Sequence, residues 1–524
     1  MTISTIAGVA YPRDLAAHSL EHAAMRVPSP TGLLAQAPVG PTQFPGYEFA
    51  ALSSLTGWTP TTSGGATVTT TTLSDGSAGI AFTLAAAASQ AYITQNCSIP
   101  YSQNTTLGLW VEFTNPATMP TLQIAFSNES GTFTNWNYLG YGSSGGGVWK
   151  GLYYINLPIS KSSVGGGSFA TSGVIQTIRL RILSSYKNQG GVVKFRGLNV
   201  SKMGRPKVAI CFDDGYASQY TEAFRYMSRY GIPGTIAVVP DFVGTAGKVT
   251  LSQLQSMYAA GWAVVGHTQS HTAFNSYATN SIATAQTPAS AGNLSLDGAV
   301  GVSTFDVPRH LVVRANDQGL KLTITGKDED GADIVETFYT WSGAYWTTTN
   351  TAFTKVTTIA VDQAATGSIT VGQSNSYSEI YSAITGSRDY LLANAMPRGA
   401  YDFVFPQGEF NALALRALAD AGMRAARVVS GQPQAPMVGD YRKYQLPGYG
   451  GGGAGLTNTV MSGYRTDAIN CGCTTVVYMH DVVTTAGLST EVSRAEFQAF
   501  IDATAADVAG GKCDVITQLD IPIA

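Results

Sequence analysis

Residues 207–216 read KVAICFDDGY, a short apolar run that ends in two adjacent carboxylates. A run of this length and composition is typical of a strand that is buried on both faces. The next segment, SQYTEAFRYMSRYG (218–231), predicts a helix that ends at a glycine cap, Gly231, and TIAVVP (235–240) predicts a second buried strand. The order strand, helix, strand is the first indication of a parallel α/β domain.

The same alternation continues along the chain. Thr250 and Gln253 form the pattern of a capping box at the start of LSQLQSMYAAG (251–261), which we predict to be a helix. WAVVGH (262–267) then predicts a third strand. Strands and helices that alternate at this spacing indicate a parallel sheet with helical crossovers.

The α/β pattern stops near Pro288 and resumes after residue 375. Residues 288–375 contain β-like runs, LKLTIT, IVETFYT, TTIAV and SITVG, around a DEDG turn. From residue 376 onward, helical segments such as ALALRALADAG alternate again with apolar runs such as RAARVVS. We therefore predict one α/β domain over 204–287 and 376–524, with a β-rich module inserted at 288–375, because exposed loops tolerate insertions.

The N-terminal part has a different character. Residues 47–203 contain short alternating runs, TLGLWVEF and TIRLRILSS among them, separated by Gly, Ser and Asn clusters. Such a pattern is typical of an all-β sandwich or jelly roll. Residues 1–46 carry closely spaced prolines and no periodic pattern, so we predict an arm or attachment segment there.

Composition excludes several classes of partner. Charged residues make up 12% of the chain, the net charge is −3, and no run of Lys or Arg is present, so we expect neither nucleic acid nor a membrane as partner. No stretch reaches about 18 consecutive apolar residues, and the N-terminus lacks the pattern of a signal peptide. The five cysteines are too few and too scattered to predict a disulfide framework.

Asp213 and Asp214 are the first candidate functional residues, because they follow the predicted strand 207–212. Adjacent side chains at a strand end point in different directions, so one carboxylate could bind a metal while the other faces a reacting water. The carboxyl ends of parallel strands are where α/β barrels place catalytic groups. The alternative is a solvated Asp-Asp-Gly turn without function.

Histidines follow two other predicted strands. His267 and His271 lie in GHTQSH, where their spacing brings both imidazoles to one side of a helical turn. With a carboxylate they would make a two-histidine, one-carboxylate metal site, although two unrelated loop histidines remain possible. His480 ends the strand TTVVYMH, where it could act as a general acid or simply cap the strand.

The segment FVFPQGEFN (403–411) adds a possible oxyanion site. It reads as a strand followed by a turn made of Pro406, Gln407 and Gly408. Turns of this kind expose backbone N–H groups that can bind an oxyanion.

Taken in order, these segments resemble the motifs of polysaccharide deacetylases of carbohydrate esterase family four, the NodB homology domain. FDDGY resembles the first motif, GHTQSH the second, FVFPQGEFN the third and VVYMH the last. The resemblance covers about residues 204–287 and 376–524. It implies a deformed (β/α) barrel and a hydrolase that removes acetyl groups from a polysaccharide with a bound metal, usually Zn²⁺, for which Co²⁺ or Ni²⁺ can substitute.

The resemblance also implies a role for each matched residue. Asp213 would be the general base and His480 the general acid, while the turn at Pro406, Gln407 and Gly408 would hold the oxyanion through the backbone N–H of Gln407. The metal ligands would be Asp214, His267 and His271.

Two parts of the family pattern are missing from the sequence. The arginine that often pairs with the base in the third motif is absent, with Val404 near its place, and Gln407 stands where that motif has tyrosine. No clear fourth motif is present, so the carboxylate partner of His480 is unidentified. Asp440 is a candidate, and Asp481 is expected to point elsewhere.

The inserted module carries a second resemblance. LKLTITGKDEDGADIVETF followed by TKVTTIAVDQAATGSITVG is similar to a β-rich module recurrent in tailed-phage structural proteins. It implies a phage tail spike or fibre, located on the virion and acting at the host cell surface on capsule or exopolysaccharide. The implied partners are an acetylated bacterial polysaccharide, phage tail or baseplate proteins, and further copies of the chain in a homotrimer.

Three alternatives stay open at this point. The chain could be a secreted, extracellular bacterial deacetylase with a carbohydrate-binding module, or a catalytically inactive glycan-binding tail protein. The two carboxylates could also belong to a glycosidase, against which the paired histidines argue.

The N-terminal sandwich is a possible glycan-binding module. It contains Trp58, Trp110, Trp136 and Trp149, whose rings could stack on sugars. A core position is the simpler expectation for Trp110, which lies inside an alternating strand. Trp136 and Trp149 lie near Gly- and Asn-rich turns and are the better candidates for exposure.

Overall fold

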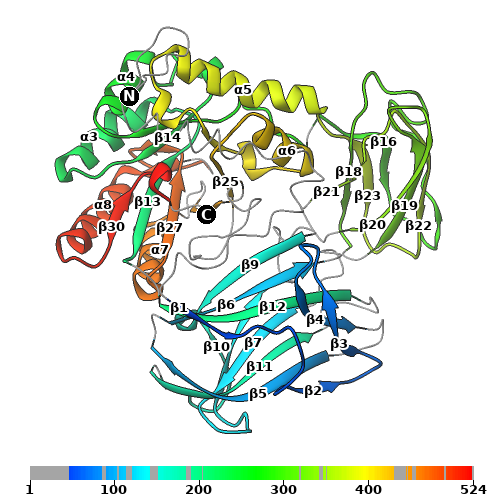
Figure 1. Cartoon of the computed structure of the whole chain (residues 1–524). Helices are drawn as coiled ribbons and strands as arrows, with labels where there is room; N and C mark the ends of the chain where they lie inside the picture. Colours follow the sequence, from blue (N-terminus) through cyan, green and yellow to red (C-terminus); the bar gives the residue numbers. More distant parts are fainter. Residues whose placement is uncertain are drawn as a thin grey trace, which may run out of the picture.

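The computed structural model places the chain in three regions, which Figure 1 shows as an N-terminal sandwich, a barrel and a smaller β-rich module. It describes residues 46–84, 90–102, 105–113, 121–141, 151–170, 172–183, 191–202, 205–275, 277–317, 320–340, 346–349, 351–429, 444, 446–450, 456–488 and 491–521. The predicted arm at 1–46 lies outside these residues except for Gly46. No helix within these ranges is long and apolar enough to cross a membrane.

Residues 46–202 form two six-stranded antiparallel sheets that enclose one core, which confirms the prediction of a β-rich N-terminal part. The first sheet has the order β3-β4-β12-β6-β9, with β1 beside β12, and the second has the order β10-β8-β7-β11-β5-β2. The strands are β1 Gly46–Ala50, β2 Thr59–Thr62, β3 Thr67–Thr72, β4 Ala78–Leu84, β5 Gln90–Tyr101, β6 Thr105–Phe113, β7 Thr121–Ser127, β8 Trp136–Tyr141, β9 Gly151–Pro158, β10 Ser163–Gly166, β11 Gly173–Leu183 and β12 Gly191–Lys202.

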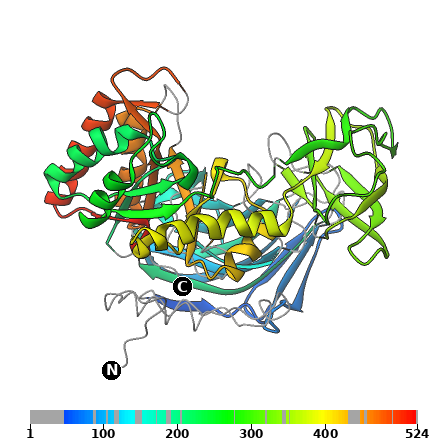
Figure 2. The ribbon, with the colours of Figure 1, turned by 90° about the horizontal axis from the view of Figure 1, so that it is seen from above.

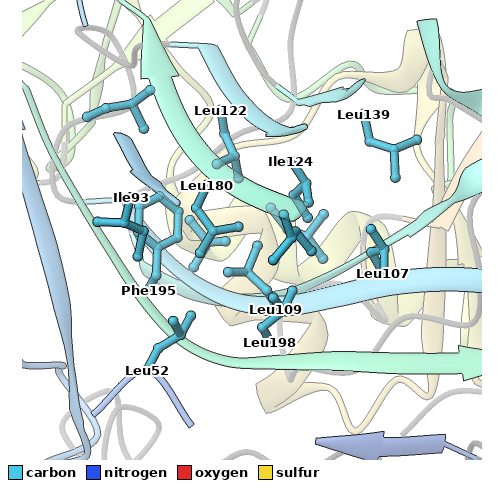
Figure 3. Packing of buried hydrophobic residues seen from close by; sticks show 14 of the residues in the cluster. Leu52, Ile93, Leu107, Leu109, Leu122, Ile124, Leu139, Leu180, Phe195 and Leu198 are labelled. Carbon is cyan, nitrogen blue, oxygen red and sulfur yellow. The ribbon is translucent and has the colours of Figure 1, made fainter. Parts of the chain in front are cut away.

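Alternation along the strands builds the sandwich core. Ile178, Leu180 and Ile182 of β11 are fully buried, and each is separated from the next by a half-buried arginine that points to the opposite face. Figure 3 shows Leu180 among the core residues Ile93, Leu109, Ile124 and others from both sheets. Burial of apolar surface stabilises a fold by about 25 cal/mol per Å². This core is therefore the main source of stability of the sandwich.

A parallel barrel follows the sandwich. Seven strands form a closed ring in the order β13-β14-β15-β24-β25-β26-β27, because β13 pairs with both β14 and β27. A further strand, β30, pairs with the first half of β13. The strands are β13 Lys207–Phe212, β14 Thr235–Val238, β15 Ala263–Gly266, β24 Asp402–Val404, β25 Ala425–Val429, β26 Leu446–Gly450, β27 Thr474–Met479 and β30 Asp514–Ile516. The predicted (β/α) barrel is thereby confirmed, and its ring of strands is closed.

Helices and short helical turns connect the strands of this barrel. They are η3 Gln219–Phe224, α3 Arg225–Met227, η4 Ser228–Tyr230, η5 Pro240–Phe242, α4 Leu251–Ala259, α5 Tyr377–Ala393, η6 Pro397–Gly399, η7 Pro406–Gly408, α6 Ala412–Asp420, α7 Asn458–Cys471, α8 Arg494–Ala509 and η9 Gln518–Asp520, with a two-stranded sheet of β28 Asp481–Val483 and β29 Glu491–Ser493. The predicted capping box of Thr250 and Gln253 is present at α4, and Gly231 ends the first helical segment in a left-handed conformation. That segment is not one α-helix as expected, since it begins as a π-helix and ends as a 3₁₀ turn.

The barrel strands alternate between two environments. On β13, Val208, Ile210 and Phe212 pack against the surrounding helices, while Ala209 and Cys211 face the barrel interior. Small interior side chains let the strands approach, and they leave room at the carboxyl end of the barrel for polar groups. The next inward position is Asp213, directly after β13. The alternation therefore places this carboxylate at the carboxyl end of the barrel.

The opposite end of the barrel is closed by the C-terminal segment. Gln518 donates to the carbonyl of Phe403, and Arg424 donates to the carbonyl of Gln518 and to both oxygens of Asp402. Both Arg424 and Asp402 are buried. Loss of one partner would leave the other as a buried, uncompensated charge. Because Arg424 also donates to Gln518, η9 helps to hold this ion pair in place.

The inserted module consists of two four-stranded sheets, β16-β23-β18-β21 and β17-β22-β19-β20. The strands are β16 Ala278–Gln286, β17 Gly292–Asn293, β18 Leu311–Ala315, β19 Lys321–Lys327, β20 Asp333–Tyr339, β21 Trp346–Thr348, β22 Lys355–Val361 and β23 Ile369–Gln373. Because β16 pairs with β23, residues 278–286, which the sequence assigned to the α/β domain, form a strand of this module's first sheet.

One buried arginine connects this module to the barrel. Arg309 donates to Glu379 on the first turn of α5 at 2.7 Å and to Asp306 at 2.8 Å. Figure 2 shows α5 as the long helix that extends from the barrel toward the module. The charge-assisted bonds therefore link the module to a helix that packs directly on the barrel strand β15.

Candidate active site

Three side chains converge at the carboxyl ends of β13 and β15. Oδ1 of Asp214 lies 3.2 Å from Nε2 of His267 and 3.1 Å from Nε2 of His271. The ligand atoms of all three lie within 4.8 Å of one another. Asp214 and His267 are buried and His271 is half-buried, so one side of the cluster stays open. The structure thus brings together the three residues that the sequence predicted as metal ligands.

The spacing of the two histidines suggested a helical turn, but the structure has none there. They lie on an irregular turn in which Thr268 and His271 have positive φ angles of 59° and 61°. Of the six non-glycine residues with positive φ in the described ranges, four lie at this site: Asp214, Thr268, His271 and Gln407. Side-chain residues rarely adopt this conformation, and such strain concentrates at functional sites.

The proton positions at His267 favour a cation between the three groups. Nδ1 of His267 lies 2.8 Å from the carbonyl oxygen of Val404, which can only accept, so Nδ1 carries the proton. In the neutral ring, Nε2 then points a lone pair at Oδ1 of Asp214, an atom that is buried without a hydrogen-bond donor. Facing lone pairs repel unless a cation lies between them. The donor set therefore fits a divalent metal ion, and the Val404 contact is the orienting bond that metal-bound histidines usually make.

Electrostatics keep the Asp214 carboxylate ionised. Burial by itself would raise the pKa of Asp214, but the adjacent rings of His267 and His271 hold it well below its usual range. An ionised carboxylate beside two imidazole nitrogens is the form in which these residues can bind a metal.

Asp213, the predicted base, is paired with an arginine. Arg427 of β25 donates to both oxygens of Asp213, and both side chains are buried. The sequence has Val404 near the position of the third-motif arginine, and no arginine stands there. Arg427, which the sequence did not single out, lies beside Val404 in the register of β24 and β25 and reaches the Asp213 carboxylate.

Tyr478 and Gly448 lie against the guanidinium group of Arg427. The guanidinium carbon lies 4.5 Å from the centre of the Tyr478 ring, a cation–π contact. A side chain at Gly448 would come within 2.9 Å of Arg427 and 3.0 Å of Tyr478. Burial lowers the pKa of Arg427, but the Asp213 carboxylate outweighs this effect and raises it. The arginine is therefore charged, and its fork holds the carboxylate in one orientation.

His480, the predicted acid, ends β27 on the inward side of the barrel. Its Nδ1 is buried and has no hydrogen-bond partner among the described residues. Asp481 accepts a hydrogen bond from Ser218 at 2.5 Å. Asp440 lies outside the described residues, and the carboxylate partner of His480 stays unassigned.

The predicted oxyanion turn follows β24. Pro406 is buried, Gln407 is exposed and has a φ of 56°, and Gly408 donates its N–H to the carbonyl of Phe405 at 2.9 Å. Phe405 in turn donates to the carbonyl of Arg427, which fixes the turn beside the strand that holds the base. A side chain at Gly408 would come within 2.5 Å of Val429, so the turn needs glycine there.

Lys248 is a residue at this site that the sequence did not single out. Its Nζ donates to the carbonyl of Asp214 at 3.1 Å and lies 3.4 Å from the centre of the Tyr216 ring. Burial lowers the pKa of Lys248. In the sequence, the loop GTAGKVT has no pattern that distinguishes this lysine from a solvent-exposed lysine. Its contact with Asp214 is seen only in the folded structure.

Comparison with known proteins agrees with the motif reading for one segment. Residues 201–290 match the family model described as polysaccharide deacetylase. Over 68 residues the chain is 32% identical to YxkH of Bacillus subtilis (strain 168), which carries the provisional name polysaccharide deacetylase. This alignment covers 13% of the chain and 24% of that protein.

Solved structures give weaker likenesses. The Xyl-CE4 domain of a multidomain xylanase from the hindgut metagenome of Trinervitermes trinervoides is 10% identical, with 61% of this chain and 90% of that chain covered and a TM-score of 0.29. A family 11 carbohydrate-binding module from Clostridium thermocellum is 13% identical, with 30% and 96% covered and a TM-score of 0.23. Nothing is inferred from scores this low. The resemblance to polysaccharide deacetylases is confirmed over residues 201–290, the segment that holds Asp213, Asp214, His267 and His271.

Proposed function

We propose that this protein is a metal-dependent hydrolase that removes acetyl groups from a polysaccharide. The supporting observation is the cluster of Asp214, His267 and His271 beside an arginine-held carboxylate, Asp213, within the segment that matches the deacetylase family. A nearby histidine, His480, completes an acid–base pair across the same end of the barrel.

The residues divide the chemistry of acetyl hydrolysis among them. A divalent ion held by Asp214, His267 and His271 supplies Lewis-acid chemistry, since such ions polarise carbonyls and lower the pKa of water. Asp213 accepts the proton of the attacking water, and the backbone N–H of Gln407 donates to the oxygen on which negative charge develops. His480 then donates a proton to the departing nitrogen or oxygen, the bond to the acetyl carbon breaks, and acetate leaves.

Loss of the metal is expected to have two separate effects. The purified chain should hold about one divalent ion, and chelation should stop acetate release and also lower the unfolding temperature, because a ligand that binds only the folded state stabilises it. His267→Ala should show the lower unfolding temperature with or without chelator. Elemental analysis, calorimetry and an acetate assay on a panel of acetylated capsular polysaccharides and exopolysaccharides check this.

A matched control is available on the neighbouring loop. Asp241 is an exposed carboxylate that accepts from Gln269 but is not among the clustered ligands. Asp241→Asn should therefore keep both the metal and the activity. A metal-free chain that releases acetate in the presence of chelator would contradict the proposal, and so would cleavage of the polysaccharide without acetate release.

Location and assembly remain predictions that rest on the resemblance of residues 288–375 to a phage module. We propose a tail spike that acts on a host capsule or exopolysaccharide, bound to tail or baseplate proteins as a homotrimer. The full-length protein should scatter light as a trimer at micromolar concentration, and antibodies should label the tails of purified particles. A monomer, or labelling confined to host cells, would favour the secreted bacterial enzyme instead.

A further inference from the structure

The outer face of the second sandwich sheet carries an unusual set of side chains. Because Ile178, Leu180 and Ile182 point into the core, Arg179 and Arg181 point outward from the same strand, β11. Tyr138 lies in the same cross-strand row as Arg179, separated by Ala125, and Tyr92 lies opposite Arg181. Figure 1 shows this sheet as the layer of the sandwich farther from the barrel. We name these four residues, with Phe133 and Trp136, the arginine–aromatic face.

Both arginines have neutral partners. Arg179 donates to the hydroxyl of Thr94 at 3.1 Å, and Arg181 donates to the amide oxygen of Gln90 at 2.9 Å and to that of Gln123 at 3.4 Å. Neither forms an ion pair within the described ranges. Burial lowers the pKa of both, and Arg181 lowers that of Arg179 further. Two half-buried positive charges thus lie on one face, neither of them paired with a carboxylate of the described residues, an arrangement that an anion would relieve.

The other sheet of the same sandwich provides the contrast. Its outward cations each have a carboxylate partner: Arg196 pairs with Asp75 at 2.9 Å and Lys194 pairs with Glu112 at 3.0 Å. Arg196 also lies over an aromatic ring, that of Trp110, at 5.0 Å. Cations over rings are therefore neutralised on one sheet and left uncompensated on the other, which distinguishes the arginine–aromatic face from ordinary sheet surface.

The aromatic side chains of this face are fixed before any ligand binds. The guanidinium of Arg179 lies between the rings of Tyr92 and Phe133, at 4.2 and 3.9 Å from their centres. Trp136 packs against Gly165, where a side chain would come within 2.5 Å of the indole.

The loop that carries Phe133 is held in place by Glu129. Its carboxylate accepts from Thr132 at 2.8 Å and from the side chain of Asn135 at 2.7 Å. A face whose side chains are ordered in advance loses little conformational entropy on binding.

We propose that the arginine–aromatic face binds an acidic polysaccharide, whose carboxylate groups pair with Arg179 and Arg181 while its sugar rings stack on Trp136 and Tyr138. Guanidinium forks match carboxylates in geometry, and flat apolar rings can cover the apolar faces of sugars. The proposal does not depend on the chemistry of the barrel, since none of these residues lies there.

Binding of defined polysaccharides to the full chain tests this proposal. Polygalacturonate serves as the acidic probe and dextran as the neutral one, with affinity measured by calorimetry at low and at physiological salt. We expect polygalacturonate to bind more tightly than dextran, and Arg179→Gln/Arg181→Gln to weaken that binding by about tenfold or more, since charge-assisted hydrogen bonds are the strong ones. Arg196→Gln, the matched arginine of the other sheet, should bind as the unaltered chain does.

Further variants keep the test decisive if the glutamine pair folds poorly. Arg179→Lys/Arg181→Lys preserves both charges and should retain most of the affinity, whereas Trp136→Ala should weaken it. Acetate release from a small acetylated sugar should be unchanged in every arginine variant, which separates this binding site from the barrel. Equal affinity for dextran and polygalacturonate, full binding by the glutamine pair, or tighter binding of single-stranded DNA than of polygalacturonate would overturn the proposal.

Discussion

Replacing Asp213 with asparagine is expected to lower the turnover of acetate release by about 10²–10⁴-fold, the usual contribution of one proton-transfer group. The amide keeps the shape of the side chain but cannot accept the proton of the attacking water. His480→Ala should cause a loss of similar size, because the leaving group then departs without a proton donor. Turnover is measured as acetate formed from the polysaccharide that the panel identifies, with the metal content of each variant determined alongside.

The residue next to the predicted acid provides the control. Asp481 follows His480 in the chain, but its carboxylate accepts a hydrogen bond from Ser218 and is not among the clustered ligands. Asp481→Asn should therefore turn over at nearly the normal rate. Near-normal turnover in Asp213→Asn or His480→Ala, with metal retained, would assign that role to another residue.

The sequence was sufficient to predict that Asp214, His267 and His271 lie together, because the strands before them are recognisable from local pattern. Asp214 is the second residue after β13 and His267 the first after β15, and parallel strands bring their carboxyl ends to one edge of the barrel. The turn that carries His271 could not be read in the same way. Its residues with left-handed backbone, Thr268 and His271, are neither Gly nor Asn, so the amino-acid sequence does not indicate this conformation.

The arginine partner of the base was missed for a different reason. Arg427 lies in an apolar strand far along the chain from Asp213, and only the register of β24 and β25 places it beside Val404. The available signal was weak but physical: a charged residue flanked by Ala425, Ala426, Val428 and Val429 must be buried and therefore paired. Which carboxylate it meets depends on long-range strand order, which local pattern does not contain.

The pairing of β16 with the inserted module was not predicted, because β16 is a weak strand by composition. Its sequence, ATNSIATAQ, has few large apolar residues and reads as a polar loop after the histidine turn. Pairing with β23 supplies the order that the segment lacks on its own. Strand propensity depends on such partners more than helix propensity does, so boundaries of this kind are set by tertiary structure.

The ion pair of Asp213 and Arg427 should affect stability as well as turnover. Removing one member leaves the other as a buried, uncompensated charge, so Arg427→Met and Asp213→Asn should each lower the free energy of unfolding by roughly 3–5 kcal/mol. The double variant Asp213→Asn/Arg427→Met leaves neither charge behind and should lose much less than the sum. Urea titration of the four proteins yields the coupling between the two residues directly.

A second buried pair separates the stabilising role of Arg427 from its orienting role. Asp402 of β24 and Arg424, which directly precedes β25, form a similar ion pair at the amino end of these strands, opposite the end that carries the clustered Asp214 and His267. Arg424→Met should therefore lose comparable stability yet retain its turnover, whereas Arg427→Met should lose turnover even at temperatures where it is fully folded. Arg427→Lys should recover stability better than turnover, because an ammonium group neutralises the carboxylate but cannot hold both of its oxygens in one orientation. Equal turnover in Arg424→Met and Arg427→Met, or strictly additive stability losses for Asp213 and Arg427, would show that the arginine contributes packing alone.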